Sequence, residues 1–398
     1  MDFTLGEELE EVRGLAAEVF ADRASTERVR AVEGSPGRVD EELWTELAKA
    51  GLLGAALPER DGGAGLGLAA LCVLLEEQGR RVAPVPVWSA AVAALAIAGY
   101  GTAGQRRDLL PAFADGAARL TLALEEFGPH DPRDPRCEAR PDGGAPGGWR
   151  LNGVKAAVPS PAGAARVLVS ARTAAGSGLF LVAAGGEGVS WERAETTSRD
   201  LGGHLTLAGA PAQAVGEQGA GVLDLVLGRA SAALAALQLG VCQGALRLAV
   251  GHLTVRRQFG RPLGAFQAVQ HQLADCYIEI DAMRVCLWRA VCALDDAPGG
   301  PGVPGGPAGR DTRDGAPDGA RAARDAEAAA LVARWWAAEA GLNVVHRVQH
   351  VHGGIGVDVD YPVHRHFLWG RQIAGTLGGA SAALARLGDV LADRAAAP

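Results

Sequence analysis

Apolar residues recur at helical spacing from the start of the chain. Leu5, Leu9 and Val12 are separated by acidic and small residues, and this period predicts an amphipathic helix over residues 4–22. Thr4 is a residue type that accepts hydrogen bonds from the free N–H groups at a helix start, so we expect it to be the N-cap. The same pattern predicts further helices over 40–53, 68–81 and 84–101. Residues 1–118 are therefore expected to form an all-α domain.

The pattern changes between residues 119 and 216. Short segments of alternating or continuous apolar residues, such as "ARVLVSAR" at 165–172, are separated by Gly, Pro and Asn. Segments of this length and spacing are typical of an antiparallel sheet. We expect residues 119–216 to form a small β domain.

Helical periodicity returns from residue 217. Segments with an apolar stripe predict helices over 223–258, 264–296 and 325–351, followed by a final helix that ends near residue 394. Long helices joined by short turns usually pack as a bundle, so 217–398 is expected to be a four-helix domain. Within it, 13 of the 27 residues from 297 to 323 are Gly or Pro, which predicts a disordered surface loop. The fold class is therefore α+β.

Composition and charge narrow the function classes. The formal net charge of -8 argues against broad electrostatic binding to nucleic acid or to an anionic membrane. The six cysteines form no C-x-x-C pair, and we expect them to be buried thiols in a reducing compartment. The segment "MDFTLGEELEEV" has no apolar h-region, and no uninterrupted apolar run reaches the ~18 residues of a membrane helix. We therefore expect a soluble, cytoplasmic protein with no membrane partner.

The first chemical motif is "TVRRQFGRPLGAFQAVQHQLAD" at 254–275. Arg256 and Arg257 stand at a predicted helix end beside Gln258 and Phe259. Guanidinium groups suit the geometry of a diphosphate, and an aromatic side chain can stack on a ring system. The alternative is a solvated basic helix end that interacts with its own dipole.

The second motif is "QHVHGGIGVDVDYPVHRHF" at 349–367. Gly353 and Gly354 allow the backbone to approach a ligand closely. Its four histidines suggest a metal site, but no helical H-x-x-x-H pair lies beside a compatible acid, so we expect no metal. The segment "GGAGLG" at 62–67 does not follow a predicted strand, as a dinucleotide-binding loop would.

These two motifs together resemble the acyl-CoA dehydrogenase family, and the resemblance covers roughly residues 3–394, including "LPERDGGAGLG" and "LNGVKAAV". It implies an N-terminal helical domain, a middle β-barrel-like domain and a C-terminal four-helix bundle. It also implies an FAD flavoprotein that oxidises an acyl-CoA to the 2,3-enoyl-CoA, commonly as a tetramer, with electron-transfer flavoprotein as a candidate acceptor. In this chemistry a carboxylate removes the α-proton while the β-hydride moves to the flavin.

The resemblance assigns roles to both motifs. Arg256, Gln258 and Phe259 would contact the diphosphate-adenosine part of a neighbouring subunit's FAD. Gln267 and the Gly353–Gly354 turn would line the same arm of the cofactor.

The flavin-ring end departs from the family pattern. Family members carry Thr-Glu-Pro-Gly on the first strand, whereas this chain has Glu125 for the Thr and Phe127 for the Pro. A carboxylate there would repel a reduced, anionic flavin. The family's Trp-Ile-Thr is replaced by 157–159, "AVP", and Pro159 has no N–H to donate. Both departures weaken the expectation of a flavin-ring site in this chain's own β domain.

The catalytic base is also missing. The usual Glu position falls at Leu377, and an alternative position used in some branches falls at Ala230. No acid occurs between Asp360 and Asp389, so a small alignment shift does not supply a proton acceptor. The backbone N–H of Leu377 could still donate to a thioester oxygen.

Three hypotheses follow. In the first, the chain is the base-lacking subunit of a heteromeric acyl-CoA dehydrogenase, and a related catalytic subunit supplies the Glu and the flavin-ring contacts. In the second, it is a self-sufficient homotetramer that uses another base, with Glu125, Asp358 and Asp360 as candidates, although each is more readily a surface acid. In the third, the fold serves as a binding scaffold without redox chemistry.

Overall fold

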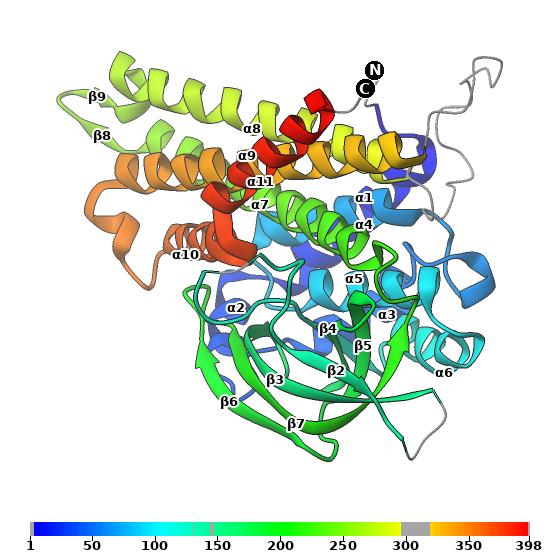
Figure 1. Ribbon diagram of the computed structural model, residues 1–398. Coiled ribbons are helices and arrows are strands. Elements are labelled where there is room, and N and C mark those ends of the chain that lie inside the picture. Colours follow the sequence, from blue (N-terminus) through cyan, green and yellow to red (C-terminus); the bar gives the residue numbers. More distant parts are fainter. Residues whose placement is uncertain (1–3, 130, 144–146, 296–318, 397–398) are drawn as a thin grey trace.

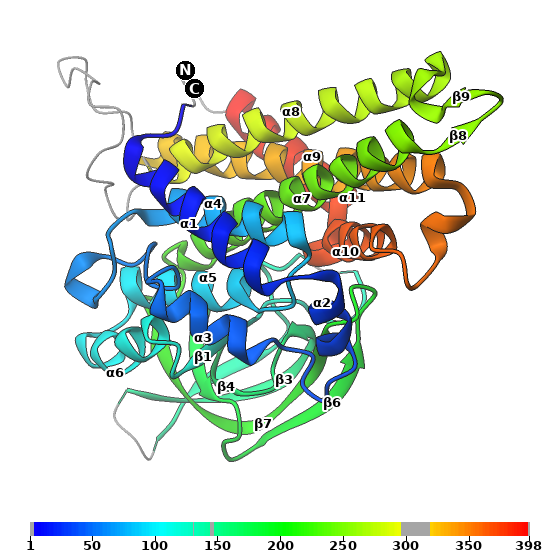
Figure 2. The same cartoon turned by 180° about the vertical axis from the view of Figure 1, so that it is seen from behind.

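The computed structural model describes residues 4–129, 131–143, 147–295 and 319–396 (Figure 1). A β domain lies at one end of the molecule and a layer of long C-terminal helices at the other. The N-terminal helices pack between these two parts, as the reverse view shows (Figure 2). The helix, sheet, helix order expected from the sequence is therefore confirmed.

The N-terminal part is helical throughout. Its elements are α1 (Glu7–Arg23), α2 (Thr26–Glu33), α3 (Glu41–Lys49), η1 (Glu59–Asp61), α4 (Gly67–Arg81), α5 (Val87–Tyr100) and α6 (Ala103–Ala114). The prediction of Thr4 as N-cap is wrong, because the cap is Gly6 and the acidic first turn of α1 starts after it. Two short helices were not predicted. Side-chain caps start both, from Ser25 for α2 and from a Thr102–Gln105 capping box for α6.

The middle part is a barrel-like sheet. Its strands are β1 (Arg119–Ala123), β2 (Glu138–Pro141), β3 (Gly148–Pro159), β4 (Ala164–Thr173), β5 (Gly176–Ala183), β6 (Val189–Glu195) and β7 (Leu201–Val215). The pairing closes a ring through β4, β2, β3, β7 and β5, and β6 adds to β7. The sheet is mostly antiparallel as predicted, but β1 and β2 run parallel to β4. A separate apolar core that includes Val167, Phe180 and Leu205 fills this ring.

The C-terminal part is a helical bundle with a projecting hairpin. Its elements are α7 (Val222–Val255), β8 (Arg257–Gln258), β9 (Arg261–Pro262), η2 (Leu263–Ala265), α8 (Gln267–Asp295), α9 (Gly319–His352), η3 (Gly353–Val357), α10 (Val363–Gly375), η4 (Thr376–Gly378) and α11 (Gly379–Ala396). The predicted single final helix is wrong, because α10 ends at Gly375 and η4, with Leu377 at φ 54°, separates it from α11. Most of the predicted loop 297–323 lies outside the described residues, but 319–323 belong to α9, contrary to the prediction.

Helix α7 joins the two helical parts. It is long and apolar enough to cross a membrane, contrary to the expectation from apolar runs, but 89% of its apolar window is buried inside the protein. It crosses α4 at Gly240, where an added Cβ would lie 1.9 Å from the carbonyl oxygen of Glu76. This close backbone contact explains why glycine occupies the middle of a buried helix. Four of the six free cysteines are buried, whereas Cys286 and Cys292 are half-buried.

Candidate functional site

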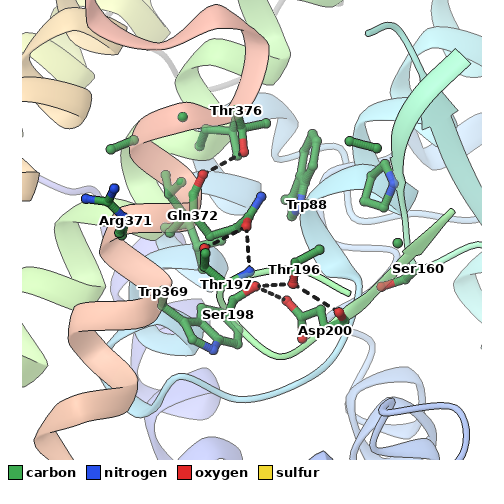
Figure 3. A pocket seen from close by; sticks show the side chains of 18 of the residues that line it. Trp88, Ser160, Thr196, Thr197, Ser198, Asp200, Trp369, Arg371, Gln372 and Thr376 are labelled. Carbon is green, nitrogen blue, oxygen red and sulfur yellow. Dashed lines mark hydrogen bonds between the residues drawn. The ribbon is translucent and has the colours of Figure 1, made fainter. Parts of the chain in front are cut away.

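A cavity of about 630 Å³ lies where the β domain meets the helices (Figure 3). Its volume is in the range of small-molecule and cofactor sites. The wall combines the segment before α5, the ends of β1 and β3, the β6–β7 turn, and the α10–α11 region; representative residues are Trp88, Glu125, Pro159, Thr196, Trp369 and Gln372.

A hydrogen-bonded polar cluster forms one side of this cavity. Gln372 Oε1 on α10 accepts from the N–H of Thr197 at 3.0 Å and from its hydroxyl at 2.8 Å. Ser198 Oγ donates to Asp200 Oδ2 at 2.9 Å and lies 2.9 Å from the Thr196 hydroxyl. Burial raises the pKa of Asp200 to about 6, although the Ser198 bond opposes that shift. The cluster ties the β6–β7 turn to α10, as the dashed lines in Figure 3 show.

Glu125 lies in the cavity wall, half-buried between the barrel and η4. Burial raises the pKa of its carboxyl, while the backbone N–H of Leu377, donating toward it, and the charge of Arg334 lower that pKa. The expectation that Glu125 is a surface acid is therefore wrong. The other two candidate bases, Asp358 and Asp360, are exposed and do not line the cavity.

Arg334 on α9 supports the turn that holds Leu377. Its side chain is buried, and Nη2 donates to the carbonyl of Ile373 at 2.7 Å and to that of Thr376. Burial lowers the pKa of Arg334 to about 10, and the Glu125 carboxylate opposes this shift. Sequence reasoning missed Arg334, although a single arginine inside the apolar run "AAALVARWWAA" was an available signal.

The two expected base positions hold no proton acceptor. Leu377 sits in the left-handed region at φ 54° and ψ 39°, and its side chain packs against the core. Ala230 is fully buried in α7. The acids that line the cavity, within the described part of the chain, are Glu125, Asp200 and Glu339.

The segments expected to face a flavin ring, around Glu125 and Ala157, are engaged by the chain's own groups. The N–H of Ala157 donates to His204 Nδ1 at 3.2 Å, and the His204 ring lies 4.8 Å from that of Phe127. Pro159 has no N–H, and Glu125 places a carboxylate beside the same strands. These residues do not fit a flavin ring, which needs neutral or positive hydrogen-bond donors at its carbonyl edge.

The first sequence motif forms an exposed hairpin at the far end of α7 and α8 (Figure 1). Phe259 and Gly260 both have positive φ values, as a two-residue type I′ turn requires. Phe259 is 89% exposed, and its ring lies 6.1 Å from that of Phe266. Arg256, Gln258 and Gln267 are also exposed. Their exposed donors and aromatic face fit a diphosphate and an adenine supplied from outside this chain's own cavity.

The second motif lies beside the first. The rings of His252 on α7 and His352 on α9 stack at 4.8 Å, which brings the Gly353–Gly354 turn to the end of α7 that carries the hairpin. A Cβ at either of these glycines would meet no atom within 4 Å. The structure therefore brings the predicted arm residues together at one end of the bundle, away from the base position at Leu377.

Comparison with known proteins identifies the family. The description "Acyl-CoA dehydrogenase, N-terminal domain" matches residues 6–117, and "Acyl-CoA dehydrogenase, C-terminal domain" matches residues 217–305. Acyl-CoA dehydrogenase FadE27 of Mycobacterium tuberculosis is 35% identical over 397 residues, which cover 99% of each chain. The chain therefore belongs to the acyl-CoA dehydrogenase family.

Two similar solved structures are each named for two proteins. A chain from a variant of the Tcur3481-Tcur3483 steroid ACAD is 62% identical with a TM-score of 0.89, over 99% of this chain and 100% of that chain. A chain of the ChsE4-ChsE5 complex from Mycobacterium tuberculosis is 34% identical with a TM-score of 0.86, over 98% of this chain and 99% of that chain. The family's cofactor is FAD, and a glutaryl-CoA dehydrogenase of the same fold from Mycobacterium smegmatis was solved in complex with FADH2.

Proposed function

We propose that this chain is the base-lacking subunit of a heteromeric acyl-CoA dehydrogenase. A related subunit supplies the catalytic carboxylate and the flavin-ring contacts. This chain supplies the hairpin and the glycine turn to the FAD held by that subunit. FAD bound there would supply the acceptor for the β-hydride of the acyl-CoA substrate, and electron-transfer flavoprotein is the proposed acceptor of the electrons.

The absence of an acid at the α10–α11 turn is the observation that carries this proposal. A general base must lie within hydrogen-bond reach of the proton that it removes. Leu377 offers only an apolar side chain at the expected position, and Ala230 offers only a methyl group. The relatives solved as pairs of proteins favour a partner that completes the reaction.

The hairpin, unlike the base position, keeps its expected residues, and this supports the same assignment. Arg256 has an exposed guanidinium, and Phe259 presents its ring to the outside. Such groups contribute to a binding site only when another molecule covers them. The missing base and flavin-ring contacts both concern the chain's own cavity, whereas the hairpin residues remain exposed. A subunit that serves its partner's cofactor would show this combination.

A self-sufficient enzyme is the alternative, and Glu125 is the observation that favours it. Its carboxyl lines the cavity with a raised pKa, as a general base near neutral pH often does. However, Glu125 stands at the family's flavin-contact position, so a carboxylate there acts against the cofactor that the reaction needs. The heteromeric assignment is therefore the stronger one. A scaffold without redox chemistry would leave the exposed hairpin unexplained.

Expression of the chain alone and with a related subunit that has the Glu tests the proposal. The lone chain is expected to lack flavin absorbance and to show no turnover of acyl-CoA with an artificial acceptor. The co-purified complex is expected to be yellow and active. A lone chain with stoichiometric FAD and turnover would show that the alternative is correct.

A further inference from the structure

The cavity of this chain keeps its volume although its chemistry does not fit a flavin ring. The groups that could receive a flavin or a thioester are already engaged inside the chain. The Ala157 N–H donates to His204 Nδ1 at 3.2 Å, and the Glu125 carboxyl lines the cavity beside Thr376 and Gly378, next to the Leu377 N–H that lowers its pKa. We propose, on the basis of the heteromeric function above, that Glu125 is the residue that closes this chain's own cavity to the flavin ring and to the acyl-CoA carbonyl.

The position of Glu125 supports this role. It lines the cavity together with Thr376 and Gly378, the residues on either side of Leu377. The Leu377 N–H is the donor that a thioester oxygen would need at this turn. A carboxylate beside this N–H competes with the thioester oxygen for it, and in its ionised form it is the stronger acceptor.

Arg334 supplies a positive charge that favours the ionised form of the half-buried Glu125 carboxyl. Arg334 is 2% exposed, and its positive charge lowers the pKa of the Glu125 carboxyl. It also fixes that turn through the carbonyls of Ile373 and Thr376. An unpaired carboxylate in such a place would be costly, and the fixed cation reduces that cost, although burial still raises the pKa of Glu125.

The charge of Glu125 acts on both ligands. A reduced flavin gains negative charge at its ring, so the carboxylate repels it. A thioester oxygen needs the N–H toward which Glu125 already lies. Glu125 is therefore a specificity-determining residue of this chain that directs both cofactor and substrate to the partner's site.

The FAD content of the full heteromeric complex tests this role, with FAD itself as the probe. The Glu125→Thr variant, which restores the family's residue, is expected to bind FAD at the second site roughly tenfold or more tightly than the unmodified complex, because a repulsive charge is removed. Glu339→Gln, which neutralises another acid of the same cavity wall, is the matched control and should leave the FAD content unchanged.

Pro159 lacks an N–H and can also limit FAD binding to this cavity, so a second pair of variants tests Glu125 with Pro159 replaced. Glu125→Thr combined with Pro159→Thr should bind more FAD than Pro159→Thr alone. The inference is overturned if Glu125→Thr adds no FAD, either alone or over Pro159→Thr, in complexes that keep their unfolding temperature. Failure of the heteromeric function is a separate result, because the unmodified complex would then already hold one FAD per chain.

Discussion

The Nζ atom of Lys155 lies 2.7 Å from a carboxylate oxygen of Glu126, and both side chains are buried in the barrel. Glu126 also accepts from the backbone N–H groups of Arg136 and Cys137 at 2.9 and 3.0 Å. Successive residues of an extended chain point in opposite directions. Because Glu126 is fixed inside the barrel, its neighbour Glu125 is directed toward the cavity.

Loss of Lys155 should therefore destabilise the protein strongly. Lys155→Met leaves the Glu126 carboxylate buried without its cation, which typically costs about 3–5 kcal/mol. For a chain of this length we expect the unfolding temperature to fall by ~4–6 °C, measured by thermal denaturation. Arg140→Ala removes an exposed ion pair of the same sheet and should change the unfolding temperature by less than ~1 °C. An equal effect of the two variants would contradict the assigned role of the buried pair.

The α4–α7 crossing should tolerate no side chain at Gly240. Its Cβ would lie 1.9 Å from the Glu76 carbonyl oxygen, so Gly240→Ala must separate the two helices at a cost of about 1–3 kcal/mol or more. Gly14 lies inside α1 with no atom within 4 Å of its Cβ, and Gly14→Ala should stabilise by ~0.5–1 kcal/mol. Denaturation of both variants compares the same substitution in two settings. A neutral Gly240→Ala would show that the crossing is looser than described.

The hairpin should matter to the complex and not to the fold of this chain. Arg256→Ala removes a charge-assisted contact worth about 1.5–3 kcal/mol, so FAD held by the partner should bind roughly 10- to 100-fold more weakly. Arg256→Lys should restore only part of the affinity, because an ammonium lacks the guanidinium fork.

Phe127→Ala is the control for the hairpin, since Phe127 is an exposed aromatic residue of the β domain that packs on His204. It should leave the partner's FAD affinity unchanged, whereas Phe259→Ala should lower it. FAD titration followed by fluorescence measures both. The reverse order of effects would place the flavin in this chain's cavity.

The Asp200 carboxyl should give the stability a defined pH dependence. Its folded-state pKa of about 6 lies above the ordinary value of 3.8, so the folded state binds its proton more tightly than the unfolded state does. The contribution of Asp200 to stability is therefore greatest below pH ~4 and is lost as pH rises through ~6. The unfolding temperature of the unmodified chain minus that of Asp200→Asn should fall between pH ~4 and ~6 and stay constant above pH ~6. A difference that rises with pH would show that Asp200 is stabilised as a carboxylate.

The sequence predicted much of this architecture because its periodicities are long and consistent. It missed α2 and β2, which are short and depend on a side-chain cap or on pairing with distant strands. The break at Leu377 was also missed, because a leucine rarely takes a left-handed conformation. That conformation depends on Arg334, which is 43 positions earlier in the chain and contacts the turn only in the folded protein.

The site was predictable in part for the same reason. The motifs around Arg256 and Gly353 each lie in one continuous segment. The long helices α8 and α9 connect the two motifs and run antiparallel, so the second motif returns to the end of the bundle where the first one lies. The relation among Glu125, Arg334 and Leu377 joins three distant segments, so only the fold reveals it. The sequence suggested that the Leu377 N–H was free for a thioester, whereas in the structure Glu125 lines the cavity beside Thr376 and Gly378, the neighbours of Leu377.

The FAD content of the purified heteromeric complex tests the central claim most directly. The complex is denatured, its released FAD is quantified by absorbance, and the result is divided by the number of chains. A subunit that serves its partner's cofactor and closes its own cavity predicts one FAD for every two chains. One FAD for every chain would contradict this account.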